Sequence, residues 1–378
     1  MAFGTLPTPL WPLYEARDGF GTTTVTVAFA VMVIGAAISF PTLGHLSDRF
    51  GRRRIVVPAL LVAIVSALVL AFWPDLPGLV IGRFLTGVAV GLMASTATAY
   101  LSDLHHEARP DRVGSAVPAL VSTAANLGGL ALGPLIAGAL AQWVPAPLMT
   151  PYLLLAVIMA IMLILVLTSP ETIDTELKSR DRPTRFALRP RQRTAFASAA
   201  AVGFFAFAVM GLFSSLGAII VRGQLGISSL FIAGLAPFAA FAASAVAQLA
   251  LGRLSKTSVL VIGTVLFPIG LALTAFSLYQ PALWLILTAA ALAGAGAGLL
   301  FKAAITQTAI AAEPASGAGV LAIFFVIAYL GMGLPSIAFS LVIQVAAIQP
   351  SMIGFAAALA LGSVVAVVVS VRATRAGR

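Results

Sequence analysis

Long apolar segments separated by short polar connectors make up most of this chain. Eleven of these segments are long enough to cross a membrane, because a spanning helix needs about 20 consecutive apolar residues. We expect spans at residues 22–44, 54–73, 78–101, 114–143, 150–168, 195–221, 228–251, 257–278, 282–309, 317–345 and 350–371. The pattern therefore predicts an all-α polytopic membrane protein.

The first 14 residues, MAFGTLPTPLWPLY, are apolar but too short to cross a membrane. Pro7, Pro9 and Pro12 break helical hydrogen bonding, and the segment has neither the basic start nor the small-residue cleavage site of a signal peptide. We interpret it as the outer half of a first helix that is truncated, and we expect a misplaced start codon to be the cause. With this partial helix, six helices precede residues 169–194 and six follow them.

The composition excludes a water-soluble fold. Of the 378 residues, 60% are hydrophobic and 9% are charged, whereas soluble domains carry about 25% charged residues. The net charge of +10 comes from arginine and lysine in the connectors, so we read it as a topology signal and expect no nucleic-acid partner. The chain has no cysteine, and its three histidines lack metal-ligand spacing, so we expect no metal site.

The basic residues also predict the orientation of the chain. Alternate connectors hold 18 of the 22 basic residues, while the opposite connectors hold only Arg17 and Arg222. Because basic connectors stay on the inner side of a membrane, the basic side and the C-terminus should be cytoplasmic. The longest polar segment, residues 169–194, then becomes a cytoplasmic linker between an N-terminal bundle at 1–168 and a C-terminal bundle at 195–378.

Three short patterns recur in the same order in the two halves. The sequence GHLSD at 44–48 resembles GRLSK at 252–256, the glycines at 87 and 91 recur at 294, 296 and 298, and Gly-Pro at 133–134 resembles Gly-Leu-Pro at 333–335. Each similarity is short, but their shared order indicates an internal duplication. Six helices followed by six related helices are typical of secondary transporters.

The connector between the second and third helices carries the most specific motif, Gly44-His-Leu-Ser-Asp48-Arg49-Phe-Gly51-Arg52-Arg53. Glycines permit a tight reversal, an aspartate can cap a helix, and arginines hold a loop at an anionic membrane surface. The motif resembles the signature loop G-x-L-x-D-R-x-G-R-R of the major facilitator superfamily. The resemblance implies two pseudo-symmetric six-helix bundles and a loop that latches them together, with Asp48 meeting the helix that starts near residue 317. The alternative is a plain basic anchor.

Two further motifs resemble elements of the same superfamily. The residues Gly129, Gly133, Pro134 and Gly138 in the fifth helix resemble the G-x-x-x-G-P-x-x-G-G element of proton-coupled drug antiporters, except that alanine stands at 137. Close packing of small residues is the alternative explanation. Arg83 resembles the arginine of the R-x-x-x-G element in the fourth helix. A charge inside a span indicates function, although Arg83 could also reach the outer interface.

Several residues are candidates for a central cavity. Lys302 lies within the tenth helix, where it could bind an anionic group of a substrate, extend to the lipid headgroups or pair with a helix C-terminus. Uncharged candidates are Asn126, Gln248 and Tyr329, together with Thr5, Ser214, Ser215 and Phe207. Packing between helices or contact with lipid is the competing explanation for each of them.

The twelve acidic residues all lie in connectors or at helix ends, so no carboxylate is expected in mid-membrane. A proton-coupling carboxylate would then lie in the absent part of the first helix, or Glu15 would serve from its outer end, or transport would be uncoupled. No phosphate-binding loop or catalytic set is present, so we expect no enzyme and no bound cofactor.

The resemblance implies alternating-access export of a small organic molecule, drug-like or a metabolite, driven by the proton gradient. It also implies a multi-pass monomer in the bacterial inner membrane, with the lipid bilayer and a small-molecule substrate as its partners. Two alternatives stay open. One is a permease for a small polar nutrient such as a sugar or an organic anion, and the other is a transport-inactive membrane sensor or assembly partner.

Overall fold

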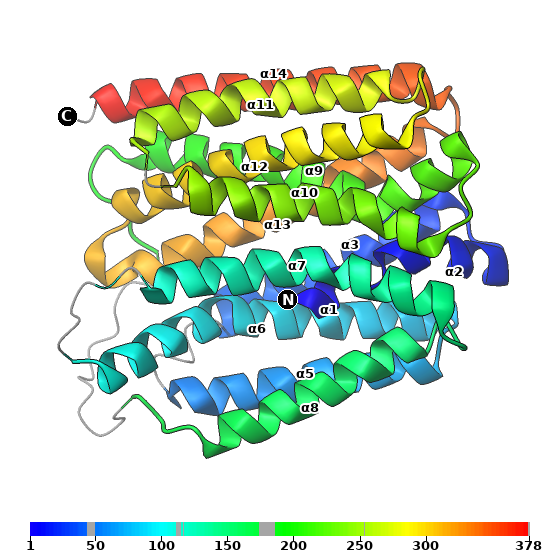
Figure 1. The fold of residues 1–378 in the computed structure, drawn as a ribbon. Helices are drawn as coiled ribbons and strands as arrows, with labels where there is room; N and C mark the ends of the chain where they lie inside the picture. Colours follow the sequence, from blue (N-terminus) through cyan, green and yellow to red (C-terminus); the bar gives the residue numbers. More distant parts are fainter. Residues whose placement is uncertain (44–49, 111–114, 116, 174–185, 253, 377–378) are drawn as a thin grey trace.

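The computed structural model describes residues 1–43, 50–110, 115, 117–173, 186–252 and 254–376, and these residues are almost entirely helical (Figure 1). Eleven helices in this part are long and apolar enough to cross a membrane, which confirms the predicted fold class. They are α3 (Thr22–Leu43), α5 (Arg52–Phe72), α6 (Leu76–Ala108), α7 (Val117–Trp143), α8 (Thr150–Thr168), α9 (Arg193–Leu225), α10 (Leu230–Ala250), α11 (Lys256–Phe276), α12 (Leu283–Ala311), α13 (Gly317–Val342) and α14 (Ile348–Ala376).

Most helix bounds agree with the predicted spans to within a few residues, and α6 differs most. It ends at Ala108, seven residues beyond the predicted end of the span. Its last turns carry His105, His106 and Glu107, which are polar but still helical. Hydropathy marks where a helix leaves the hydrocarbon region, whereas backbone hydrogen bonding continues into the polar region.

The N-terminal segment is a helix broken by prolines. It consists of α1 (Ala2–Thr5), a 3-10 turn η1 (Thr8–Leu10) and α2 (Trp11–Asp18), and α2 ends at Gly19, which has a φ of 67°. Pro7 lies between α1 and η1, and Pro9 lies within η1. The helix is interrupted here because proline has no N–H to donate to a helical hydrogen bond. Leu10 and Trp11 are fully buried, so this segment is part of the protein core.

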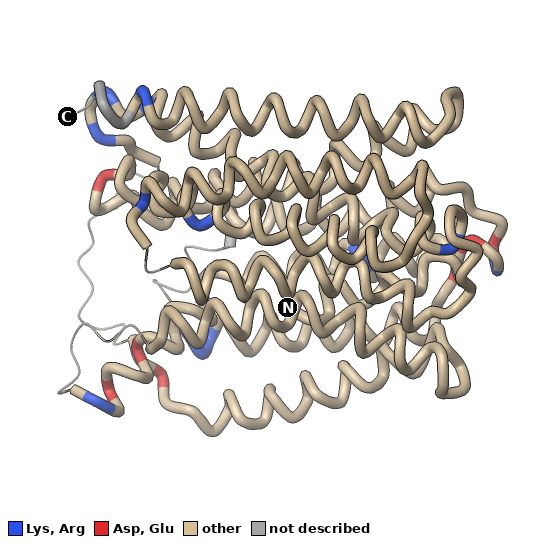
Figure 2. Tube along the Cα trace, turned by 45° about the horizontal axis from the view of Figure 1, so that its top comes forward, with Lys and Arg blue, Asp and Glu red and all other residues tan. Residues whose placement is uncertain are grey.

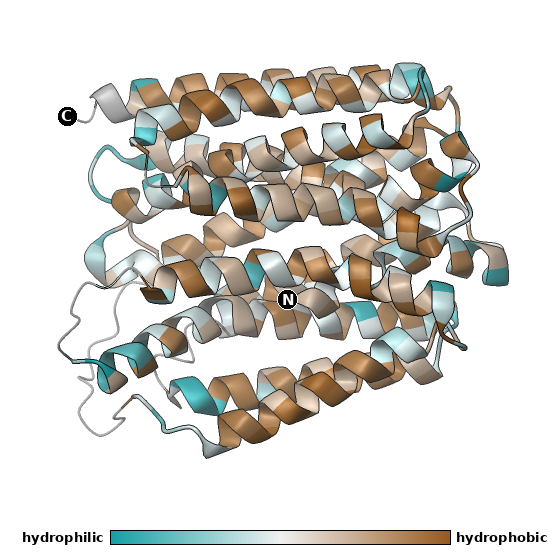
Figure 3. Ribbon diagram, in the orientation of Figure 1, coloured by the Kyte–Doolittle hydropathy of each residue, from teal (hydrophilic) through white to brown (hydrophobic). Residues whose placement is uncertain are grey.

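The charged residues lie mostly at the two ends of the helices (Figure 2). One end carries Arg52 at the start of α5, Arg193 at the start of α9 and Arg372 near the end of α14, and we call it the basic end. The opposite end carries Arg17 and Arg222. Between the two ends the helix surfaces are largely apolar (Figure 3). This distribution is what a multi-pass membrane protein requires.

The helices pack as two groups. In the first bundle α3 and α5 pack on α6, α5 packs on α8, and α1 packs on α7. In the second bundle α10 and α11 pack on α12, α9 packs on α12 and α13, and α14 packs on α9 and α11. The two bundles meet mainly where α3 packs on α13 and α7 packs on α10, and α2, α3 and η1 also contact α9.

The repeated glycines mark equivalent helix crossings in the two bundles. A β-carbon at Gly87 of α6 would lie 2.0 Å from the Met32 carbonyl oxygen of α3. A β-carbon at Gly294 of α12 would lie 2.1 Å from the Ala240 carbonyl oxygen of α10. Since only glycine allows such a close approach, the recurring glycines have the same structural cause in both halves.

Candidate functional site

A cavity of about 80 Å³ lies between the two bundles. Its wall is formed by α1, α3, α6 and α7 of the first bundle and by α9, α10, α12 and α13 of the second. Pockets that bind drug-sized molecules usually measure about 300–1,000 Å³. The cavity is therefore contracted in this conformation and would have to widen to hold such a ligand.

All three uncharged residues that the sequence singles out for a cavity line its wall. Asn126 comes from α7, Gln248 from α10 and Tyr329 from α13, so both bundles contribute. Thr5 and Phe207 also line the wall.

Two serines proposed on the same grounds, Ser214 and Ser215, are fully buried in α9 outside the wall. The Ser215 hydroxyl donates to the carbonyl oxygen of Gly211, 2.7 Å away, within its own helix. The main-chain carbonyl oxygen of Ser214 accepts a hydrogen bond from Trp11 Nε1 at 3.0 Å. Both serines therefore serve helix packing.

Aromatic and thioether side chains dominate the rest of the wall. The ring centroid of Phe207 lies 4.7 Å from that of Phe301 and 5.5 Å from that of Tyr329. Four methionines join them, at positions 1, 32, 210 and 332, and no charged side chain of the described residues lines the wall. Aromatic rings and flexible methionines suit apolar ligands of variable shape.

An aromatic contact connects the two bundles on the side of the cavity nearer the basic end. Phe40 of α3 stacks on Phe325 of α13 with centroids 5.1 Å apart and an interplanar angle of 10°. Phe40 also meets the edge of Tyr329 at 5.2 Å. No pattern in the sequence predicts this contact, because a single phenylalanine in an apolar helix is indistinguishable from one that faces lipid.

Hydrogen bonds between the bundles lie toward the opposite end. Five hydrogen-bonded pairs between them lie in this half. The pairs are Trp11 with Ser214, Thr23 with Ser340, Thr26 with Ser340, Thr23 with Gln344 and Gln142 with Leu230. The bundles are thus joined by hydrogen bonds on one side of the cavity and by aromatic rings on the other.

Arg83 of α6 is fully buried, which rules out the alternative that it reaches the outer interface. Its Nη1 donates to the Gly4 carbonyl oxygen at 3.0 Å, and its Nη2 contacts the Met32 sulfur at 3.1 Å. Its Nε has no hydrogen-bond partner. The guanidinium also lies 5.8 Å from the Trp11 ring centroid and 5.5 Å from that of Phe29.

No salt bridge to Arg83 occurs among the described residues. A buried guanidinium without a carboxylate is costly, and evolution rarely retains one without a function. Gly4 and Met32, which Arg83 contacts, both line the cavity. Arg83 therefore lies behind the cavity wall and contacts two of the residues that form it.

Lys302 does not line the cavity. Its Nζ donates to the carbonyl oxygen of Gln248 at 3.1 Å, in the last turn of α10. Carbonyl groups in the last turn of a helix lack partners within the helix and attract cations. Of the three roles considered for Lys302, the structure favours pairing with a helix C-terminus, and the lysine supports Gln248 from behind.

The signature loop is described only in part. Gly44, Asp48 and Arg49 lie outside the described residues. Gly51 adopts a φ of 111°, a conformation that favours glycine. Arg53 donates to the Ser169 carbonyl oxygen at 2.8 Å.

Two carboxylates hold Arg52 in place. Its Nε donates to Asp103 at 3.1 Å, and its backbone N–H donates to Glu171 at 2.7 Å. Glu171 thereby caps the start of α5, where a negative charge is favourable. The sequence analysis does not single out Asp103, near the end of α6, or Glu171, because both are far from the loop along the chain, although their position just after a predicted span is a usable signal.

The glycines of the helix-five motif have two different neighbours. A β-carbon at Gly129 would lie 3.2 Å from the Ala2 nitrogen, and one at Gly133 would lie 2.3 Å from the Ala2 carbonyl oxygen, so both pack α7 against α1. A β-carbon at Gly138 would lie 2.7 Å from the Leu230 carbonyl oxygen of α10. Pro134 contributes its carbonyl oxygen to the same interface, 2.6 Å from a β-carbon at Gly234. The motif therefore joins α7 to α1 and to the second bundle.

Residues 1–334 match the family model described as Major Facilitator Superfamily. Among curated proteins, the chain is 42% identical over 82 residues to the glucose transporter GlcP of Staphylococcus epidermidis, covering 22% of this chain and 18% of that protein. It is 30% identical over 140 residues to the bacillibactin exporter of Bacillus subtilis, covering 36% of this chain and 34% of that protein. These matches span about a fifth to a third of the relatives' lengths.

Solved structures match over nearly the whole chain. The human organic anion transporter MFSD10 aligns with a TM-score of 0.69 at 16% identity, covering 97% of this chain and 96% of that one. A mutant of the nucleoside transporter NupG aligns with a TM-score of 0.72 at 11% identity, covering 98% and 96%. At such low identity the similarity concerns the fold alone.

Proposed function

Because the chain belongs to the Major Facilitator Superfamily, we propose that it is a secondary-active transporter that exports a largely apolar, uncharged organic molecule by alternating access. Membership in a family of transporters also confirms the expectation that the chain is not an enzyme. The observation that carries the proposal is the composition of the cavity wall, with Phe207, Phe301, four methionines and no charged side chain among the described residues.

The composition of the cavity wall argues against a nutrient permease, whether its substrate is an organic anion or a sugar. An organic anion would need a cation, but Lys302 bonds to a carbonyl outside the wall and Arg83 lies behind it. A sugar would need many convergent hydrogen-bonding groups, whereas the polar wall residues are Thr5, Asn126, Ser244, Gln248 and Tyr329, and Thr5 is already bonded to Leu130. The similarity to GlcP keeps a sugar as the second candidate.

Export is supported by the helix-five motif and by similarity to efflux proteins. A segment of 142 residues is 28% identical to the multi-drug resistance efflux pump PmrA of Streptococcus pneumoniae, covering 36% of this chain and 34% of that protein. We propose the proton gradient as the energy source and Glu15, in the last turn of α2, as a coupling candidate. Burial raises the pKa of its carboxyl group above the ordinary value.

The substrate class can be tested with three dyes of different charge in energised cells. We expect expression of the protein to lower the accumulation of Nile red, which is uncharged. The accumulation of ethidium, a cation, and of fluorescein, an anion, should not change. An uncoupler should abolish the effect if protons drive transport. Unchanged Nile red with lowered fluorescein, or glucose uptake instead of dye efflux, would contradict the proposal.

A carboxylate placed in the wall provides a matched test. We expect Asn126→Asp to add ethidium efflux, because a buried carboxylate attracts a lipophilic cation into the cavity. Ser122→Asp places the same charge one turn away on α7, outside the wall, and should not add it. Equal behaviour of the two variants would show that the cavity does not select the substrate.

We also propose that the basic end faces the cytoplasm of a bacterial cell, with the protein as a monomer in the plasma membrane. The absence of cysteine from the chain makes single-cysteine labelling free of background. We expect a membrane-impermeant maleimide to label Gln280→Cys at the opposite end in intact cells, and Ala108→Cys at the basic end only after lysis. Both residues are exposed. The reverse labelling pattern would refute this orientation.

A further inference from the structure

The interface between α9 and α14 ends in two exposed arginines at the basic end. Arg193 is the first residue of α9, and Arg372 lies near the end of α14. Among the described residues, neither arginine forms a salt bridge or a hydrogen bond. In the first bundle, by contrast, Arg52 pairs with Asp103 at 3.1 Å and Arg53 donates to a carbonyl oxygen at 2.8 Å.

The two arginines lie at a similar depth. The helices cross closely where a β-carbon at Gly362 of α14 would lie 2.3 Å from the Phe205 ring of α9. Arg372 lies ten residues after Gly362 in α14, and Arg193 lies twelve residues before Phe205 in α9. Because the two helices are antiparallel, both arginines lie on the basic side of the crossing. At 1.5 Å per residue these separations are about 15 and 18 Å, so both residues lie at the basic end at similar distances from the crossing.

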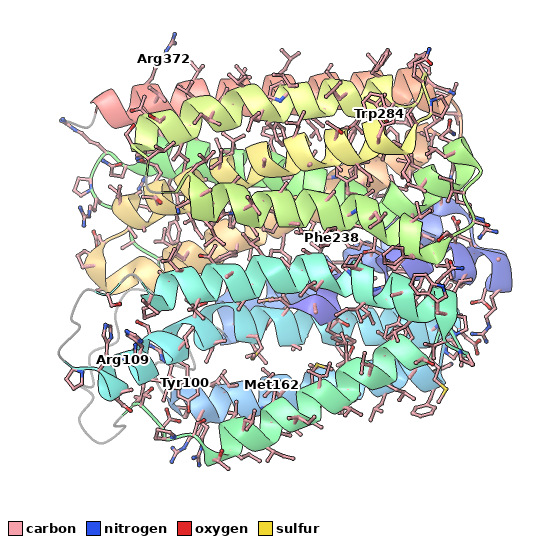
Figure 4. All side chains as sticks on the ribbon, in the orientation of Figure 1. Tyr100, Arg109, Met162, Phe238, Trp284 and Arg372 are labelled. Carbon is pink, nitrogen blue, oxygen red and sulfur yellow. The ribbon has the colours of Figure 1, made fainter. Side chains whose placement is uncertain are left out.

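An apolar stripe on α14 leads to this pair. Leu361, Val365 and Val368 are 67%, 61% and 43% exposed, and Arg372 follows them. Their spacing of four, three and four residues places all four side chains on one face of the helix. Figure 4 shows Arg372 pointing away from the bundle at the end of this helix. The surface thus presents an apolar track with two cationic groups at its end.

We propose that Arg193 and Arg372 bind the phosphate of an anionic phospholipid, one of whose acyl chains lies along the stripe of α14. Guanidinium groups bind phosphate oxygens in a bidentate manner, and the two arginines match the negative charge of the headgroup. If the two arginines served only as a topology signal, any position in a connector would be sufficient. Such a signal would not require similar depths on two neighbouring helices or an apolar stripe beside them. The site lies in the cytoplasmic leaflet if the proposed orientation holds.

The test measures lipid binding to the delipidated full-length protein in detergent by native mass spectrometry. Phosphatidylglycerol and the zwitterionic phosphatidylcholine are titrated separately. We expect the apparent affinity for phosphatidylglycerol to fall about fivefold in Arg193→Gln or Arg372→Gln and about 25-fold in the double variant, following the typical contribution of one basic residue at an anionic surface. Phosphatidylcholine binding should change little.

Two control variants make the result specific. Arg222→Gln removes the same charge from the other end of α9 and should bind phosphatidylglycerol like the wild type. Arg193→Lys with Arg372→Lys keeps both charges and should retain most of the affinity. Wild-type affinity in the double glutamine variant, or an equal loss in Arg222→Gln, would overturn the proposal. Because the assay measures no transport, its failure would leave the proposed transport function untouched.

Discussion

We expect Arg83→Met to lower transport about tenfold to 100-fold without lowering the stability of the protein. The variant removes the charge-assisted hydrogen bond to the Gly4 carbonyl oxygen. Such bonds contribute about 1.5–3 kcal/mol, and each 1.36 kcal/mol corresponds to a factor of about ten in rate. The transport rate falls by this factor if the bond between Arg83 and Gly4 is needed to keep α1 in place beside the cavity while the bundles move.

Stability should behave differently from transport in the same variant. Arg83 is fully buried without a carboxylate partner among the described residues, and its Nε is unpartnered. Replacing a buried charge by an apolar side chain of similar size is often neutral or stabilising. We therefore expect the melting temperature of purified Arg83→Met to equal or exceed that of the wild type.

Two further variants separate the charge from the packing. Arg83→Lys keeps the charge but cannot reach Gly4 and Met32 with two fixed donors, so transport should recover only in part. Thr86→Val changes another fully buried polar residue one turn along α6 and should transport like the wild type. A destabilised Arg83→Met, or wild-type transport in it, would contradict the functional role.

Gly138→Val should produce the second large effect, by wedging the two bundles apart. The new β-carbon would lie 2.7 Å from the Leu230 carbonyl oxygen and 3.1 Å from the Phe231 Cα. Overpacking of this kind costs about 1–3 kcal/mol. Because this contact joins the bundles at the opposite end, we expect the variant to favour opening there and to lose most of its transport activity.

Opening can be measured with one added cysteine. Ser340→Cys places a nearly isosteric thiol at the α3–α13 interface, where Ser340 is fully buried and bonded to Thr26. We expect Gly138→Val to increase its reaction rate with maleimide by about tenfold or more, the change that a shift of 1.4 kcal/mol between conformations produces.

A glycine on the same helix provides the control for this experiment. A β-carbon at Gly128 would have no atom within 4 Å, so Gly128→Val adds the same side chain to α7 in open space. It should leave both transport and the Ser340→Cys reaction rate close to those of the wild type. If Gly128→Val is as defective as Gly138→Val, helix propensity rather than the interface between the bundles explains the loss.

Several features could be predicted from the sequence because they are local. A membrane span depends on about 20 consecutive residues, so hydropathy locates each of the eleven spanning helices found in the described residues. The recurring glycines at 87 and 294 were recognised as related, and the structure places them at equivalent helix crossings. Asn126, Gln248 and Tyr329 are polar residues within apolar helices, which makes them candidates for a cavity, and all three line it.

Other features depend on contacts between distant parts of the chain. The sequence does not decide whether Lys302 faces the cavity or a helix end, because a lysine can be stabilised in either position. The packing of α12 against α10 places it beside the Gln248 carbonyl group. Glu171 lies 119 residues from Arg52, and nothing in either segment pairs them. Phe40 and Phe325 likewise have no signature that distinguishes a ring in a contact from a ring in lipid.

The sequence by itself determined that this chain crosses a membrane many times, where its helices lie and which of their ends are basic, because hydropathy and charge act on each segment separately. Only the tertiary structure decided that Arg83 is buried behind the cavity wall, that no charged side chain of the described residues lines this wall, and that α9 and α14 cross at Gly362. Those properties depend on which faces of the helices meet. In an apolar solvent every face of such a helix is acceptable, so hydropathy carries no information about its neighbours.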